Sequence, residues 1–120
     1  MVEKMRREAW RKGVYLFNEG DYWECHEVLE PAWLEATGTE KHFLGGMILL
    51  AAALHKARHM DSPRGGRRNF AKSLAKLALV DDGYNGVDVR ELEAIVHDAL
   101  RRPDSRPQIP HLQEEARGSG

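Results

Sequence analysis

Tryptophans frame a group of ionisable side chains near the start of this chain, in the segment Phe17-Asn-Glu-Gly-Asp-Tyr-Trp-Glu-Cys-His-Glu-Val-Leu-Glu-Pro-Ala-Trp33. Residues three and four positions apart share a face of a helix, so a helix here would carry several of these side chains on one stripe. The stripe consists of Trp23, His26, Glu27, Glu30 and Trp33 or Leu34. We expect this face to be buried, and buried ionisable groups need partners. The segment therefore predicts a polar ligand pocket centred on His26, Glu27 and Glu30.

A divalent metal ion is one candidate cofactor for this pocket. His26 and Glu30 are four residues apart, and His55 and His59 have the same spacing further along the chain. Helix pairs that present imidazoles and carboxylates inward form the metal sites of helical bundles, and these ligands suit zinc, iron or manganese. The Glu-x-x-His motif of di-iron bundles is missing, which disfavours a di-iron oxidase. The candidate metal ligands are therefore His26, Glu30, His55 and His59.

Acid–base catalysis is a second alternative, because His26 next to Glu27 or Glu30 resembles the oriented imidazole of many hydrolases. In a metal-assisted hydrolase, His26, Glu30 and His55 would bind the metal and Glu27 would act as the base. Cys25 points about 100° around the helix from His26, which disfavours a Cys–His nucleophile pair. The chain also lacks a Gly-x-Ser-x-Gly motif, a phosphate-binding glycine loop and a dinucleotide fingerprint.

Three further interpretations need no catalysis. The ionisable groups could form a hydrogen-bonded network that fixes how the helices pack. They could instead line a pocket for a small molecule or a partner, which is the leading interpretation. Charge distribution also leaves a homo-oligomeric structural module open, because residues 13–40 contain acids but no Lys or Arg, whereas Arg64-Gly-Gly-Arg-Arg68 is basic. Opposite charges of this kind can pair within one chain or between subunits.

Composition limits the class of protein. A chain of 120 residues with 42% hydrophobic and 31% charged residues suits one globular domain. The single cysteine, Cys25, cannot form an internal disulfide, and the charged N-terminus does not resemble a signal peptide, so we expect a cytoplasmic protein. The longest apolar run, residues 43–54, is shorter than the ~20 residues of a membrane-spanning helix. The formal net charge of −1 gives no basic excess for nucleic-acid binding.

Helical periodicity extends over most of the chain and predicts an all-α bundle of about five helices. The first helix should span residues 2–17. Asp21 and Glu24 should form a capping box for the second helix, which Pro31 should kink or divide in two. We expect Thr39 to cap a third helix that reaches about Met60 and is buried at the centre of the bundle.

Two more helices are predicted after the third. One begins at Ser62-Pro63, because proline is tolerated in the first turn. The last begins at Asp88, which forms a capping box with Glu91, and ends near Arg101. Prolines then interrupt residues 103–110. We therefore predict a helical domain over residues 1–102 and a flexible, irregular tail over residues 103–120.

The motif Phe17-Asn-x-Gly-x-Tyr-Trp-Glu-x-His-Glu-x-Leu-Glu-x-x-Trp33 resembles the signature of the domain-of-unknown-function 309 (DUF309) family of small prokaryotic proteins. The resemblance continues through Leu44-x-Gly-x-Ile48 and Ala51-Ala-Ala-Leu-His55, and more loosely to about Leu79. It implies a compact helical fold and no established enzyme activity. Similar proteins often carry glutamine where this chain has Gly45 and Leu49, and alanine where it has Cys25. If those positions line the site, the resemblance implies a drier site in this chain.

Overall fold

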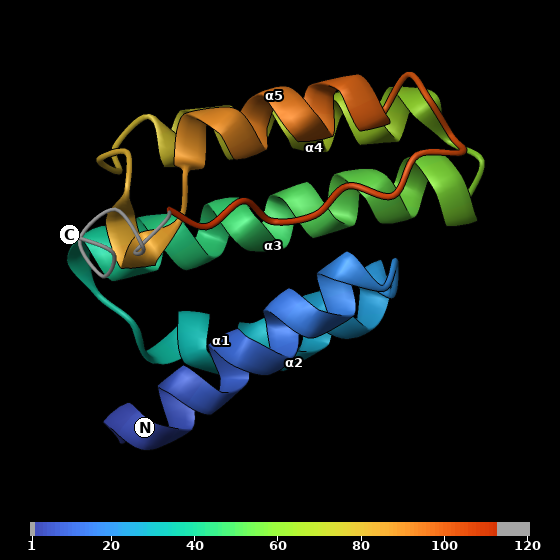
Figure 1. Ribbon diagram of the computed structural model, residues 1–120. Coiled ribbons are helices and arrows are strands. Elements are labelled where there is room, and N and C mark those ends of the chain that lie inside the picture. Colours follow the sequence, from blue (N-terminus) through green and yellow to red (C-terminus); the bar gives the residue numbers. More distant parts are fainter. Residues whose placement is uncertain (1, 113–120) are drawn as a thin grey trace, which may run out of the picture.

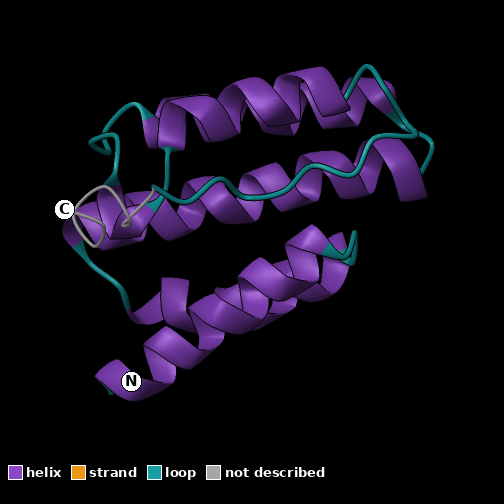
Figure 2. Ribbon diagram, viewed as in Figure 1, coloured by secondary structure: helices purple, strands orange, loops and turns teal. Residues whose placement is uncertain are grey.

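Five α-helices form the part of the chain that the structure describes, residues 2–112. The computed structural model orders them as α1 (Glu3–Asn18), α2 (Tyr22–Glu35), α3 (Gly38–His59), α4 (Pro63–Leu77) and α5 (Val89–Ala99), with a short 3-10 helix, η1 (Tyr84–Gly86), before α5 (Figure 1). Extended pairing within these residues is limited to one isolated bridge between Val87 and His111. Figure 2 shows helices joined by loops, with one long loop segment that runs along the bundle. The all-α prediction is therefore confirmed.

Helix α3 lies at the centre of the bundle, with α2 packed on one side and α4 on the other (Figure 1). Its middle is buried, as the apolar run predicted, and Phe43, Leu50 and Leu54 are fully inaccessible. Gly46 allows α4 to approach closely, because a Cβ atom at this position would lie 2.4 Å from Leu77 Cδ2. Although α3 is apolar at its centre, no helix within residues 2–112 has both the length and the apolar character needed to cross a membrane.

The structure confirms the predicted starts of α4 at Ser62-Pro63 and of α5 at Asp88, while only the Asp88 half of the predicted capping box with Glu91 forms. The Ser62 hydroxyl accepts a hydrogen bond from the Gly65 amide at 3.1 Å at the start of α4. The Asp88 carboxylate accepts one from the Glu91 amide at 3.3 Å at the start of α5. Both residues place a side-chain oxygen over the first turn, where backbone amides have no partner within the helix.

The predicted caps of α2 and α3 do not form. Asp21 precedes α2 but makes no side-chain capping bond. Its own amide is held by the Leu16 carbonyl at 2.8 Å, which fixes the turn after α1. Helix α3 begins two residues earlier than a cap at Thr39 would place it, with Thr37 at the N-cap position and no side-chain capping bond. Helix α2 continues through Pro31, so no separate short helix forms after it.

Residues 103–112 belong to the segment that we predicted as a tail, and they run back along α3 (Figure 1). Ile109 is only 5% exposed, and its amide donates a hydrogen bond to the Asn18 side-chain oxygen at 2.8 Å. The Asp88 amide donates to the Pro110 carbonyl at 2.9 Å. These contacts tie the segment to α1 and to the start of α5. The remainder of the predicted tail, residues 113–120, lies outside the described residues.

Candidate functional site

The predicted stripe on α2 faces outward more than the sequence indicated. Trp23 is 45% exposed, Glu27 and Glu30 are exposed, and His26 and Trp33 are half-buried. The buried side of α2 lies one position away and consists of Tyr22, Cys25, Leu29 and Ala32. Large and small side chains share this buried side, and the two tryptophans lie outside it. The expectation of a buried ionisable stripe is therefore wrong.

Three residues of the predicted stripe, His26, Glu30 and Trp33, line a common hollow. A pocket of about 220 Å³ lies at the junction of α2, α3 and α4, and we call it the α2–α4 pocket. It is lined by His26, Glu30, Trp33, Gly45, Ile48, Leu49 and Lys76. Two predicted members, Trp23 and Glu27, are not among the lining residues. Because Glu27 is exposed outside this pocket, it is not placed to act as a base on a molecule held there.

The wall that α3 contributes is shaped by Gly45 and Leu49. A Cβ atom at Gly45 would lie 3.1 Å from Trp33 Nε1, so the missing side chain makes room for the indole. The Lys41 ammonium lies 4.3 Å from the centre of the Trp33 ring and forms a cation–π contact on this ring. Gly45 and Leu49 are the two positions where the resemblance described above implied glutamine in similar proteins. Both line the pocket here, so its α3 wall carries no polar side chain at these positions.

A row of aromatic and imidazole rings leads from the pocket toward the end of α3. Trp23 stacks on His26 with ring centres 4.9 Å apart and an interplanar angle of 10°, and it contacts His55 at 5.3 Å. His55 meets His59 at 5.4 Å. Nδ1 of His26 and Nδ1 of His55 are buried and have no hydrogen-bond partner within the described residues. Burial, and then the nearby His59, lower the pKa of His55.

The four candidate metal ligands do not converge. Within residues 2–112 no three His, Cys, Asp or Glu side chains form a group that could hold a metal ion. Glu30 lies opposite Leu49 of α3, whereas His59 lies at the end of that helix beside Tyr22. At a rise of about 1.5 Å per residue, Leu49 and His59 are separated by ~15 Å along α3. The register of α2 against α3 therefore divides the predicted ligand set, and the prediction of one site built from all four is wrong.

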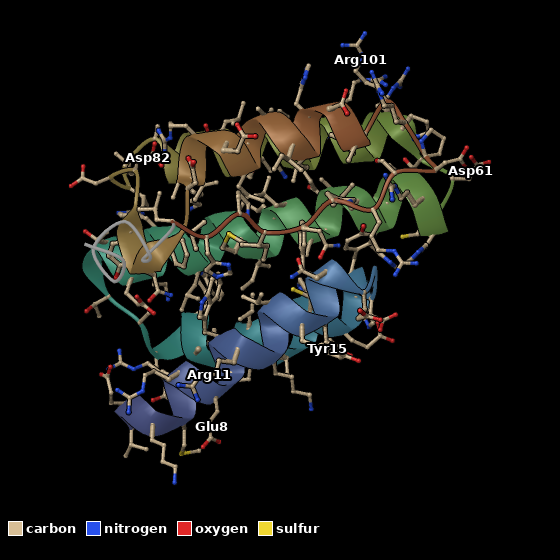
Figure 3. The ribbon with its side chains drawn as sticks, in the orientation of Figure 1. Glu8, Arg11, Tyr15, Asp61, Asp82 and Arg101 are labelled. Atoms are coloured by element: carbon tan, nitrogen blue, oxygen red, sulfur yellow. The ribbon has the colours of Figure 1, made fainter. Side chains whose placement is uncertain are left out.

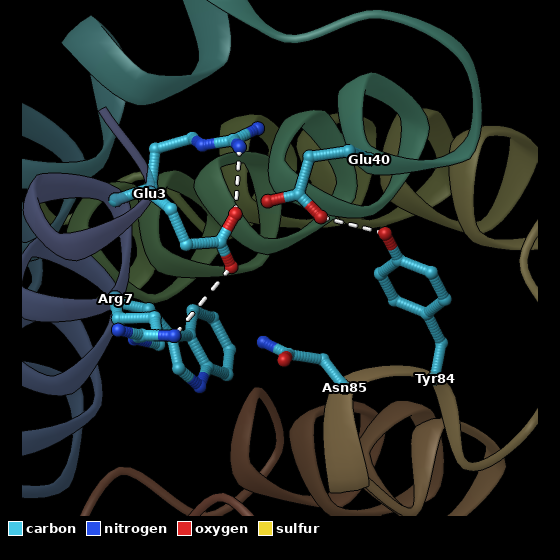
Figure 4. Close-up of a pocket in the computed structure, with 7 residues that line it drawn as sticks. Glu3, Arg7, Glu40, Tyr84 and Asn85 are labelled. Atoms are coloured by element: carbon cyan, nitrogen blue, oxygen red, sulfur yellow. Dashed lines mark hydrogen bonds and ion pairs between the residues drawn. The ribbon is translucent and has the colours of Figure 1, made fainter. Parts of the chain in front are cut away.

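A second polar hollow, which sequence reasoning missed, lies between the start of α1 and η1 (Figure 4). Its volume is about 350 Å³. Glu3 pairs with Arg6 at 3.0 Å and with Arg7 at 3.8 Å, and the Tyr84 hydroxyl donates to Glu40 at 2.6 Å. Burial, followed by this hydrogen bond, raises the pKa of Tyr84 to about 12. The residues come from three distant segments, and no sequence spacing connects them.

Exposed polar side chains cover the outer faces of the helices, including Glu8 and Arg11 on α1 and Arg101 after α5 (Figure 3). Tyr15 projects from α1 in the same view and is 62% exposed. No residue of this outer group lines the α2–α4 pocket. His26, Glu30 and Trp33 therefore differ from these outer side chains, because they line a pocket formed by three helices.

Comparison with known proteins places the chain among relatives without an assigned function. It is 29% identical over 94 residues to an uncharacterised protein of Aquifex aeolicus, covering 78% of this chain and 28% of that protein. It is 34% identical over 86 residues to the uncharacterised protein YpuF of Bacillus subtilis, covering 67% of this chain and 49% of that protein. The chain thus spans less than half the length of these two curated relatives.

A solved structure has the same fold. The crystal structure of a conserved hypothetical protein from Thermus thermophilus matches with a TM-score of 0.70 and 42% sequence identity, over 77% of this chain and 95% of that one. The family model described as "Domain of unknown function (DUF309)" matches residues 10–69, a range that contains every pocket residue except Lys76. The chain therefore belongs to the DUF309 family.

Proposed function

We propose that this chain is a binding module that takes a small, largely apolar molecule in the α2–α4 pocket. The observation that carries the proposal is the meeting of three motif side chains, His26, Glu30 and Trp33, with the apolar Ile48 and Leu49 in one pocket. Ligand pockets are typically concave and mostly apolar, with a few polar groups that orient the ligand. The volume of about 220 Å³ is sufficient for a substituted aromatic ring, since an engineered cavity of about 150 Å³ holds benzene.

The charges around the pocket favour a neutral polar group on the ligand. Glu30 and Lys76 both line it, so a ligand with a single charge of either sign is attracted by one side chain and repelled by the other. A hydroxyl group can donate to the carboxylate or the imidazole and accept from the ammonium without this conflict. The proposed ligand class is therefore a small alcohol with an apolar body, of which benzyl alcohol is a simple probe.

The test is a titration of the ¹⁵N-labelled protein with benzyl alcohol, benzylamine and benzoate, followed through the indole N–H signal of Trp33. This signal is assigned by its loss in Trp33→Phe. We expect saturable shifts, with benzyl alcohol binding more tightly than either charged probe. Leu49→Gln should weaken benzyl alcohol binding by about tenfold, because it replaces an apolar contact with a polar amide.

Leu34→Gln is the matched control for this change. Leu34 follows Trp33 on α2, is 62% exposed and does not line the pocket, so its replacement should leave the affinity unchanged. The proposal is wrong if no probe gives a saturable shift, or if both leucine variants weaken binding equally. Metal-assisted hydrolysis is not retained as an alternative, because within residues 2–112 His26, Glu30 and His55 do not form a group that could hold a metal ion.

A cytoplasmic location is part of the same proposal. It is supported by Cys25, the single cysteine of the chain, which is buried as a free thiol. Burial raises the pKa of this thiol to about 12, which keeps it protonated and unreactive. A single buried cysteine that forms no disulfide fits a protein of a reducing compartment. Fractionation of cells that make the protein tests the location, and recovery outside the cytoplasm would contradict it.

A further inference from the structure

A separate pocket lies where the turn between α1 and α2, the end of α3 and residues 103–106 meet. Its volume is about 450 Å³, and we call it the Tyr22 pocket. The side chains that matter for its chemistry are Tyr22, Arg58, His59 and Arg106, with Glu19 and Asp104 also in its lining. None of these residues lines the α2–α4 pocket, so binding here is independent of the function proposed for that pocket.

The hydroxyl of Tyr22 has no hydrogen-bond partner within the described residues. Tyr22 is only 1% exposed, and its ring is fixed by an edge contact with Phe17 at 5.4 Å. Native structures rarely leave a buried hydroxyl unpaired, because it loses its hydrogen bonds to water on folding. An unpaired group of this kind next to a pocket indicates a missing water or ligand.

Positive charge gathers around this hydroxyl. Arg58 is held in place by the carbonyl oxygens of Ala99 at 2.9 Å and Arg102 at 3.0 Å, and by Ser105, while its Nε remains buried without a partner in the described part of the chain. Burial raises the pKa of Tyr22, and among the pocket residues the charges that act on it are the guanidiniums of Arg58 and Arg106, which oppose this rise.

His59, Glu19 and Asp104 are the other ionisable side chains that line the Tyr22 pocket. The centre of the His59 ring lies 5.8 Å from that of the Tyr22 ring, and both side chains line the pocket. The charged pocket residues that act on the Tyr22 hydroxyl are the two guanidiniums, and the hydroxyl itself offers an unused O–H donor. An anionic oxygen is the atom that these groups can bind.

We propose that the Tyr22 pocket is an oxyanion-binding site, in which a phosphate or carboxylate group accepts hydrogen bonds from the Tyr22 hydroxyl, the Arg106 guanidinium and the His59 imidazole. Arg58 acts as a fixed positive charge behind this site. The hydroxyl is closed to solvent in the ligand-free chain, so side chains around it must shift as the ligand enters. Hydrogen bonds from several donors to one charged group are stronger than those between neutral groups, which supports selective binding of an oxyanion.

The experiment is an NMR titration of the ¹⁵N-labelled full chain with inorganic phosphate and, separately, with acetate, at constant ionic strength. The reporters are the backbone amides of Gly20, Ser105 and Arg106. We expect saturable shifts with at least one of the two anions. Binding of phosphate alone identifies a phosphate site, and binding of acetate alone identifies a carboxylate site. The absence of a saturable shift with both anions would overturn the proposal.

Two variants and two matched controls test the assigned contacts. Tyr22→Phe and Arg106→Gln should each weaken anion binding by about tenfold, because each removes a donor to a charged group. Tyr15→Phe and Arg101→Gln make the same changes at exposed residues outside the pocket and should alter the affinity by less than about twofold. Equal affinities in all four variants would contradict the proposal.

The stability of Tyr22→Phe separates binding from folding. Because the hydroxyl has no partner within the described residues of the ligand-free chain, the Tm of this variant without anion should equal or exceed that of the wild type. Adding the bound anion should raise the Tm of the wild type more than that of Tyr22→Phe. If Tyr22→Phe loses stability, the exposed Arg106→Gln decides the result, and unchanged anion binding in that variant would refute the site.

Discussion

Gly45 and Gly46 are neighbours in α3, yet we expect opposite effects when each is replaced by alanine. A Cβ atom at Gly46 would lie 2.4 Å from Cδ2 and 2.5 Å from Cγ of Leu77, which is fully buried and has no free space to move into. Overpacking of a core usually costs about 1–3 kcal/mol, and contacts this short point to the upper end, about 3 kcal/mol. Alanine recovers about 1 kcal/mol through its better helix propensity. Gly46→Ala should therefore lower the free energy of unfolding by about 2 kcal/mol.

The side chain that a Cβ atom at Gly45 would contact can move more easily than Leu77. Its Cβ would lie 3.1 Å from Nε1 of Trp33, a half-buried indole at the edge of the α2–α4 pocket. A shift of this ring by a few tenths of an ångström relieves the contact, so the helix-propensity gain of up to about 1 kcal/mol should largely remain. We expect Gly45→Ala to be as stable as the wild type or slightly more stable.

Urea unfolding at 25 °C, followed by far-ultraviolet circular dichroism, measures both effects against the wild type under identical conditions. The two variants are controls for each other, because they make the same substitution at adjacent positions of one helix. A Gly46→Ala protein as stable as the wild type would refute the close approach of α3 and α4 at Leu77. A larger loss in Gly45→Ala than in Gly46→Ala would refute the assignment of these positions to the two sides of α3.

Three further predictions concern single contacts. Tyr84→Phe removes the hydrogen bond to Glu40 and should lower the free energy of unfolding by about 1 kcal/mol at neutral pH. Because the pKa of Tyr84 is raised to about 12, the wild type should lose stability relative to this variant as the pH rises from about 10 to 12, and parallel pH curves would contradict this. Arg58→Lys loses the planar donor group that binds carbonyls at the end of α5 and beyond, and should destabilise the chain by about 2 kcal/mol. Hydrogen exchange should then accelerate in residues 105–109, and unchanged protection there would count against the role of Arg58. The lowered pKa of His55 means that its contribution to stability is present above its usual pKa of 6.5 and is lost as the pH falls through the folded value. His59→Ala should raise the pKa of His55 in an NMR titration, and an unchanged value would show that the two rings are not in contact.

Local sequence signals identified the helices more reliably than their packing faces. The apolar run at residues 43–54 correctly predicted that α3 lies at the centre, and Ser62 and Asp88 correctly marked two helix starts. The inward face of α2 was placed one position off, because the large tryptophans suggested burial. In the structure the buried face carries Tyr22, Cys25, Leu29 and Ala32 instead. Which face is buried depends on how the helix packs against its neighbours, and not only on the hydrophobicity of its residues.

The candidate site was predictable only where its residues share one helix. His26, Glu30 and Trp33 follow helical spacing, and they line one pocket. The residues across from them, Ile48 of α3 and Lys76 of α4, depend on how far one helix is shifted along another, and the sequence does not specify this shift. For the same reason the spacing of His55 and His59 suggested a metal site that the register of α2 and α3 divides.

The most direct test of the binding proposal is to locate benzyl alcohol on the protein by intermolecular nuclear Overhauser effects. The proposed site predicts contacts from the ring protons of the probe to the Leu49 methyl groups and to the indole protons of Trp33, since both side chains line the α2–α4 pocket. These contacts should disappear in Leu49→Gln and persist in Leu34→Gln. Contacts to the exposed Trp23 in place of Trp33, or no contacts at saturating probe, would contradict a ligand site in this pocket.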